Sequence, residues 1–386
     1  MKWITNLSSI ANRVNEVRSP GAGLRLILVG AGILLASCTA SDLPTPTRVP
    51  SSTPRASNVP QPTATMPTPL PTTVEPAERP TPSPFEGELF FPEDLNAGVE
   101  PVQYVQDRCE YLRLRWDPDR SPPGTIVAPI MFHTVRKSGR PLIDDTSITE
   151  EYFDAVLGHA RELGFETITT TELDAFLRSN ARIPPRTMIL ILDDRRPGVT
   201  ERFLPYLVKN DWTLTLAWII EDQRDYLWNW MEFLAEGGRL DFQSHGYRHE
   251  YIVKETSEQI IREELFSPIP IQMGHFGYRP TAYIWPGGNF TNRSVELARD
   301  AGYKNGFTAN PQGPLMFNWI PQGEAEREIG DPLMTLPRFW STVAWVSLDQ
   351  TVSIAAQAAT HARAQYPLEA AWYNAACDAI LPPLAD

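Results

Sequence analysis

The chain has 386 residues, with 47 Asp or Glu against 34 Lys or Arg, so its formal net charge is −13. Nucleic acid and anionic lipid surfaces are held through basic faces, and this charge argues against either as an electrostatic partner. The length leaves room for one large folded domain or two small ones.

The N-terminus has the composition of a secretory leader. Its first 25 residues carry four basic side chains and one acid. They run into Leu26–Ala36, which at 11 residues is too short to span a bilayer core of about 30 Å. The next residues, Leu35-Ala36-Ser37-Cys38, resemble the cleavage box of bacterial lipoproteins, in which the Cys is acylated. We therefore expect residues 1–37 to be a lipoprotein signal peptide. An ordinary cleaved signal with a chance Cys is the alternative.

The segment after the leader is expected to be a tether. Of the 46 residues from Thr39 to Pro84, 13 are Pro, 10 are Thr and 5 are Ser, so almost nothing could build a core. We assign residues 38–90 to this Pro/Thr-rich tether and residues 91–124 to an N-terminal extension of the folded domain. The lipid on Cys38 would hold the protein at the outer face of the cytoplasmic membrane.

Two further cysteines follow the tether. Removal of residues 1–37 would leave 30 basic and 46 acidic residues, a net charge of −16, in an extracytoplasmic chain. Cys109 and Cys377 are then an even pair in an oxidising compartment, and we expect them to form a disulfide. Two unrelated buried thiols are the alternative.

From residue 125 onward, short β-branched runs alternate with amphipathic helical patterns. Ser147 and Glu150 are spaced as a capping box ahead of the first helix. The alternation predicts a parallel sheet or barrel with functional groups at the C-terminal ends of the strands. Strands are expected at residues 125–132, 165–168, 187–192, 213–220, 239–242 and 282–285, and helices at residues 153–163, 171–177, 204–208, 258–265 and 294–301.

Two polar groups fall at such strand ends. Asp193 and Asp194 directly follow one apolar strand, and His245 and His249 follow another. One carboxylate and two imidazoles can bind a divalent metal with a position left open for water, and the second carboxylate is then free to act as a base. A turn-forming acidic pair and a hydrogen-bonded surface histidine pair are the alternatives.

These residues resemble the motifs of the metal-dependent polysaccharide deacetylases of carbohydrate esterase family four. The family's Thr-Phe-Asp-Asp-Gly corresponds to Ile-Leu-Asp-Asp-Arg at residues 191–195, and its His-Ser/Thr-x-x-His corresponds to residues 245–249. Residues 127–133 are similar to the opening segment of the exopolysaccharide-type members. Later blocks of the family are similar to residues 285–288 and 296–303.

The resemblance covers about residues 125–339 and implies a fold of the α/β class, an incomplete or distorted (β/α) barrel. We assign residues 125–345 to this polysaccharide deacetylase-like domain and residues 346–386 to a C-terminal helical extension. Carried over by position, the resemblance also implies a set of roles. Asp193 is the general base, Asp194, His245 and His249 are ligands of a divalent metal expected to be zinc, and the backbone N–H of Gly287 is a donor to the oxyanion.

Three departures from the family pattern bear on activity. Arg195 replaces the motif Gly and is expected to carry a bulky cation near the site. The family's late acid His is absent after residue 307, because His361 falls in an Ala-rich helical pattern typical of a surface position. We expect His133 to act as the general acid instead, with a structural role as its alternative. Gly287 stands where many members have Tyr, which keeps the backbone donor but removes a side-chain wall.

The sequence therefore predicts a lipid-anchored, extracytoplasmic N-deacetylase of an N-acetylhexosamine polymer, either exopolysaccharide or peptidoglycan. Tyr247 and Trp285 lie near the predicted site and could stack on sugar rings, but ordinary core packing is the interpretation we favour for each. A catalytically decayed carbohydrate-binding lipoprotein on the same fold is the alternative function, and a metal hydrolase acting on another amide is a third.

Overall fold

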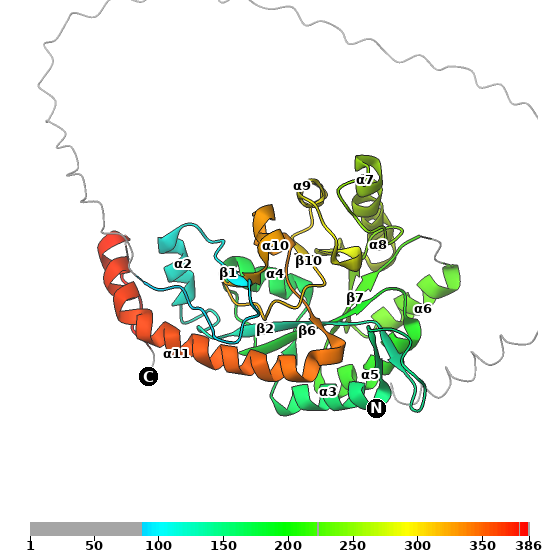
Figure 1. The fold of residues 1–386 in the computed structure, drawn as a ribbon, viewed down its shortest axis with the longest axis horizontal. Coiled ribbons are helices and arrows are strands. Elements are labelled where there is room, and N and C mark those ends of the chain that lie inside the picture. The colour runs from blue at the N-terminus through cyan, green and yellow to red at the C-terminus, as the bar shows by residue number, and fades with distance from the viewer. Residues whose placement is uncertain (1–86, 222–223, 378, 385–386) are drawn as a thin grey trace, which may run out of the picture. The chain divides into compact units, whose positions relative to one another are not determined.

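The apolar runs of the sequence form a curled parallel sheet in the computed structural model, which describes residues 87–221, 224–377 and 379–384 (Figure 1). The predictions for the leader and Cys38, and most of the tether, lie outside the described residues. The strands of this sheet are β2 (Ile126–Phe132), β5 (Glu166–Thr167), β6 (Arg186–Asp193), β7 (Leu214–Trp218), β8 (Leu240–Ser244), β9 (Ala282–Ile284), β10 (Asn305–Phe307) and β12 (Phe339–Trp340).

The main path of the sheet runs in the order β10, β9, β8, β7, β6, β2 and β12, and β5 also pairs with β6. Every pair in this sheet is parallel. The prediction of a distorted or incomplete (β/α) barrel is confirmed. Because all strands run the same way, their C-terminal ends meet at one edge of the sheet, as the alternation predicted.

Both faces of the central strands are buried, which explains why the sequence of β6 is continuously apolar. Met188 and Leu190 pack into one core cluster, whereas Ile189 and Ile191 pack into another on the opposite face. The helices around the sheet are α2 (Arg108–Arg115), α3 (Glu150–Glu162), α4 (Thr170–Ser179), α5 (Pro197–Asn210), α6 (Asp225–Ala235), α7 (Glu258–Phe266), α8 (Pro268–Phe276), α9 (Asn292–Asp300), α10 (Glu324–Ile329) and α11 (Ala344–Ala376).

The start of α3 differs from the prediction. Its N-cap is Thr149, whose side chain accepts a hydrogen bond from the Tyr152 N–H at 3.2 Å. Ser147 instead donates its hydroxyl to Asp144 at 2.7 Å. The capping box predicted at Ser147 is therefore wrong. The reason is tertiary, because β4 (Ser147–Thr149) pairs with β3 (Thr134–Arg136) and keeps the chain extended up to residue 149.

The two extensions of the domain are joined to it. On the N-terminal side, β1 (Glu100–Val102) pairs antiparallel with β11 (Ile320–Gln322). On the C-terminal side, α11 runs along the sheet beside β2 and α3, and the expected boundary at residue 345 falls inside it (Figure 1).

The predicted disulfide between Cys109 and Cys377 is confirmed, with 5.8 Å between the two Cα atoms. It links α2 to the residue after α11. None of the helices in the described part of the chain is both long enough and apolar enough to cross a bilayer.

Candidate active site

Four strands deliver the predicted site residues to the same edge of the sheet. His133 follows β2, Asp193 is the last residue of β6, His245 follows β8, and Gly287 lies just beyond β9. The parallel register of β2, β6, β7 and β8 brings these strand ends together. The site is therefore built by the sheet itself and not by one continuous segment.

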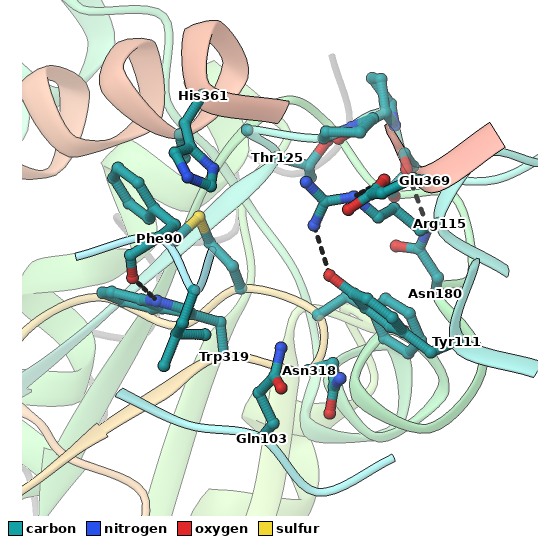
Figure 2. Close-up of a pocket in the computed structure, with 18 of the residues that line it drawn as sticks. Phe90, Gln103, Tyr111, Arg115, Thr125, Asn180, Asn318, Trp319, His361 and Glu369 are labelled. Carbon is teal, nitrogen blue, oxygen red and sulfur yellow. Dashed lines mark hydrogen bonds and ion pairs between the residues drawn. The ribbon is translucent and has the colours of Figure 1, made fainter. Parts of the chain in front are cut away.

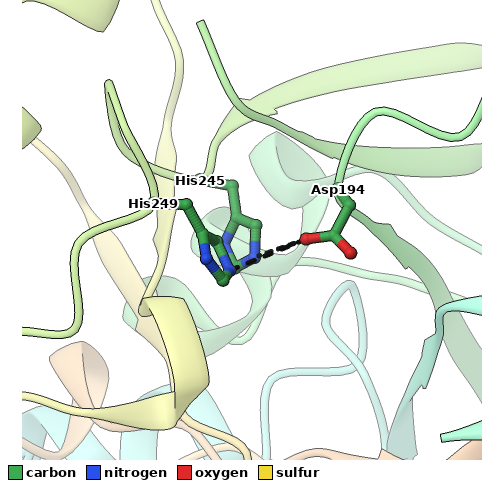
Figure 3. Close-up of side chains that lie close together, drawn as sticks. All are labelled: Asp194, His245 and His249. Carbon is green, nitrogen blue, oxygen red and sulfur yellow. Dashed lines mark ion pairs between the residues drawn. The ribbon is translucent and has the colours of Figure 1, made fainter. Parts of the chain in front are cut away.

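The three residues predicted as metal ligands converge (Figure 3). Asp194 Oδ1 lies 3.7 Å from His245 Nε2 and 3.6 Å from His249 Nε2. One ligand atom from each of the three residues lies within 4.8 Å of the other two. This separation suits donors that share one ion, and their role as ligands stays a prediction.

The protonation of His245 also suits a ligand. Its Nδ1 lies 2.8 Å from the carbonyl oxygen of Ile284, which can only accept, so Nδ1 carries the proton and Nε2 keeps its lone pair. Burial lowers the pKa of His245 to about 4 against the opposing effect of Asp193, and burial also lowers the pKa of His249. Two neutral imidazoles and one carboxylate are the donor set of many catalytic zinc sites, so the residues present fit a divalent metal.

The loop between the two histidines is shaped by Glu264 of α7, which the sequence analysis missed. This buried carboxylate accepts backbone N–H bonds from Tyr247 at 3.0 Å, Arg248 at 2.8 Å and Glu250 at 3.3 Å. Gly246 makes the close approach with a φ of +84°, and a Cβ there would lie 2.2 Å from Glu264 Oε2. The glycine after His245 was the sequence signal for this packing.

Asp193, the predicted base, is buried beside a second residue that was missed, Arg338. Arg338 Nη1 donates to Asp193 Oδ1 at 2.6 Å, while its Nε donates to the Thr308 carbonyl at 2.7 Å. Burial raises the pKa of Asp193, but Arg338, His245 and His133 outweigh it and lower the pKa to about 2. The carboxyl is therefore ionised, as a base requires. In the sequence, the signal for this buried arginine was its position between Pro337 and Phe339.

His133 lies next to Asp193, and its role as the general acid stays a prediction. Its Nε2 is 3.6 Å from Asp193 Oδ2, and its ring faces Trp340 with centroids 6.2 Å apart and planes 15° from parallel. Its Nδ1 is buried and has no hydrogen-bond partner among the described residues. The geometry leaves Nδ1 free and Nε2 directed at the base.

Tyr251 occupies the space beside Gly287. Gly287 has a φ of +62°, and a Cβ there would lie 3.1 Å from Cε1 and Cζ of the Tyr251 ring. Tyr251 is 57% exposed, and its ring meets the His249 ring edge-on, with centroids 5.4 Å apart. The side-chain wall that a Tyr would form at residue 287 is thus supplied by Tyr251, which the sequence analysis did not find.

The two aromatic residues considered for sugar stacking pack against the core. Trp285 is fully buried and donates its Nε1–H to the Met334 carbonyl at 2.8 Å, so it is a core residue, as the favoured interpretation of the sequence had it. Tyr247 is partly buried against the core, with the Arg248 guanidinium 5.2 Å from its ring centroid.

The cation beside the predicted metal ligands is Arg196 and not Arg195. Arg195 directs its Nη1 to the carbonyl oxygen of Glu221. Arg196 instead contacts the Asp194 carboxylate, at 2.6 Å from Nη2. The turn itself is made by Asp194, which adopts a φ of +68°, so the chain turns without a glycine at residue 195.

His361 lies far from these residues. It sits on α11 beside a cavity of about 120 Å³ that is also lined by Thr125, the residue before β2 begins (Figure 2). His133 follows the other end of the same strand, so His361 cannot serve the site. It is partly buried, with its ring 5.5 Å from that of Phe90, and not on the open surface as expected.

Comparison with known proteins finds a family that matches part of the chain. Residues 180–306 match the family described as "Polysaccharide deacetylase", which confirms the resemblance seen in the sequence. That stretch contains Asp193, Asp194, His245, His249 and Gly287. No curated protein matches the chain.

Among solved structures, the Streptococcus pyogenes deacetylase PplD, solved in complex with acetate, is similar in fold. It is 18% identical with a TM-score of 0.50, and the match covers 59% of this chain and 98% of that one. IcaB from Ammonifex degensii is 17% identical with a TM-score of 0.46, over 60% of this chain and 97% of that one. A de-N-acetylase from Aggregatibacter actinomycetemcomitans is 11% identical with a TM-score of 0.47, over 58% of this chain and 99% of that one.

Proposed function

We propose, on the basis of the match between residues 180–306 and the polysaccharide deacetylase family, that this protein is a metal-dependent hydrolase. Its reaction removes N-acetyl groups from an N-acetylhexosamine polymer, either exopolysaccharide or peptidoglycan. The observation that carries the proposal is an ionised, buried Asp193 next to the convergent group of Asp194, His245 and His249.

The chain's own residues account for the proton transfers. A zinc or similar ion held by Asp194, His245 and His249 would supply a Lewis acid for the acetamide carbonyl. Asp193 removes a proton from the attacking water through Oδ2, the oxygen not bound by Arg338. The Gly287 N–H donates to the oxyanion that forms. His133 gives a proton to the nitrogen as the C–N bond breaks, and an amine and acetate leave.

A sugar polymer is supported by the exposed aromatic surface at the site. Tyr251 is more than half exposed and lies beside Gly287 and His249. A residue that served only the core would be buried. Aromatic rings of this kind pack on the apolar faces of pyranose rings. Tyr251 would hold the sugar whose acetamido group enters the site.

Two variants test the reaction against the binding alternative. Asp193→Asn should keep the metal content but lower acetate release from an N-acetylglucosamine oligomer by about 100-fold or more. His245→Ala should lose metal and activity together, because two remaining ligands hold a divalent ion poorly. Thermal melting checks that both variants fold. A parent protein that binds the glycan but neither holds metal nor releases acetate would establish the decayed-enzyme function instead.

We also propose that the lipid on Cys38 places the enzyme outside the cytoplasm, which agrees with the Cys109–Cys377 disulfide. Cys38→Ala should move the protein from the membrane fraction to a soluble or unprocessed form. Unchanged fractionation, with no acyl mass on the parent protein, would contradict this anchor.

A further inference from the structure

Arg196 holds one of the two oxygens of the predicted ligand Asp194. Its Nη2 and Nε donate to Asp194 Oδ2 at 2.6 and 3.2 Å. Its Nη1 donates to Thr134 Oγ1 at 2.8 Å. The guanidinium is therefore fixed on both sides, between the start of α5 and β3, and does not swing freely in solvent.

The other oxygen of Asp194 faces the histidines. Oδ1 lies 3.7 Å from His245 Nε2 and 3.6 Å from His249 Nε2. One oxygen of the Asp194 carboxylate thus faces Arg196, and the other faces the two histidines. A carboxylate oxygen that already accepts two N–H bonds from a guanidinium is poorly placed to bind a cation as well, so the contact leaves Oδ1 as the oxygen available to a metal.

The backbone at this position depends on such contacts. Asp194 has a φ of +68°, a left-handed conformation that L-residues seldom adopt. A residue stays in this conformation when its surroundings hold it there. The Arg196 contact, two residues along the same turn, is a direct restraint on where the carboxylate points.

We propose that Arg196 is a positioning residue that makes Asp194 a one-oxygen ligand and so sets which divalent cation the site prefers. The inference rests on the ligand set of the proposed function. Zn²⁺ suits four ligands that include two imidazoles and a single carboxylate oxygen. Mn²⁺ prefers more oxygen donors, which a free carboxylate can supply with both of its oxygens. Arg196 therefore favours Zn²⁺ over Mn²⁺.

Metal titration of the metal-stripped full chain tests this without any substrate. Arg196→Met, which removes both the hydrogen bonds and the charge of the guanidinium, should lower the ratio of Zn²⁺ to Mn²⁺ affinity by about 10-fold. Arg196→Lys keeps the positive charge but loses the pair of N–H bonds that the guanidinium donates to Asp194 Oδ2. It should also lower the ratio of Zn²⁺ to Mn²⁺ affinity, and it should not raise the Zn²⁺ affinity itself. The neighbouring Arg195→Met is the matched control. It removes the same charge but not a contact to Asp194, so it should keep the parent ratio.

An unchanged or increased ratio in a folded Arg196→Met variant would overturn the proposal, as would an equal fall in Arg195→Met. A parent chain that binds neither cation would overturn it together with the ligand set. A parent that binds Zn²⁺ preferentially but releases no acetate would remove the proposed function and leave the role of Arg196 intact. Failure of the Arg196 proposal and failure of the proposed function are therefore distinguishable.

Discussion

Arg338 and Asp193 form a buried ion pair whose two members depend on each other. Their side chains are 1% and 3% exposed, and 2.6 Å separates Nη1 from Oδ1. Removing one partner from such a pair leaves an uncompensated buried charge, which costs about 3 to 5 kcal/mol. The same arginine keeps the Asp193 carboxyl ionised, so it serves both the stability of the fold and the proposed base.

A double-mutant cycle measures that dependence. Arg338→Met alone should lower the free energy of unfolding by about 3 kcal/mol or more, whereas Arg338→Met combined with Asp193→Asn should lose less than the sum of the single changes. Urea denaturation of the four proteins gives the coupling energy. Strict additivity would show that the two buried groups do not compensate each other.

The loop from β8 to α7 is the element that turns two histidines toward one point. Its shape comes from three backbone N–H bonds to Glu264 and from the close approach of Gly246. A side chain at residue 246 must displace the carboxylate that holds residues 247, 248 and 250. The orientation of His249, which itself has a φ of +67°, depends on this support.

Gly246→Ala should therefore weaken metal binding by about 10-fold to 100-fold, the usual effect of disturbing the support of a ligand. Gly238→Ala is a matched control, since Gly238 also has a positive φ, of +67°, but has nothing within 4 Å of its added Cβ. The control should lose about 1 kcal/mol of stability and keep the parent metal affinity. Equal metal affinities in the two variants would contradict the role given to Glu264.

At the scale of the whole molecule, the Cys109–Cys377 disulfide joins residues that are 268 positions apart. Closing so long a loop restricts the unfolded chain, and the chain-entropy model gives about 5 kcal/mol as the upper range of its contribution. The bond fastens α2 to the end of α11, the two elements that flank the barrel in sequence.

A variant with Ser at both cysteines should unfold at lower urea concentration than the parent. Reductant should lower the urea midpoint of the parent to that of the variant. It should leave the midpoint of the variant unchanged, because only the parent has a disulfide to reduce. Two free thiols titrated in the unfolded, unreduced parent would rule out the disulfide in the protein.

Much of this architecture follows from local sequence. Periodicity located β2, β6 and β9 and helices such as α4 and α7, because burying an apolar face imposes a regular pattern on the chain. The Asp-Asp and His-x-x-x-His groups were visible because carboxylates and imidazoles directly after apolar strands are typical of a metal site. The paired cysteines were visible because an even number of cysteines after a predicted secretory leader is typical of a disulfide.

The tertiary structure alone decided which distant residues complete the site. Arg338, Glu264 and Tyr251 lie outside the motifs that predicted the site, and β3 moved the start of α3 by imposing an extended pairing. It also decided that Arg196, and not Arg195, meets Asp194. The physical reason is that charge compensation and close packing act through space, between side chains that only the folded sheet brings together.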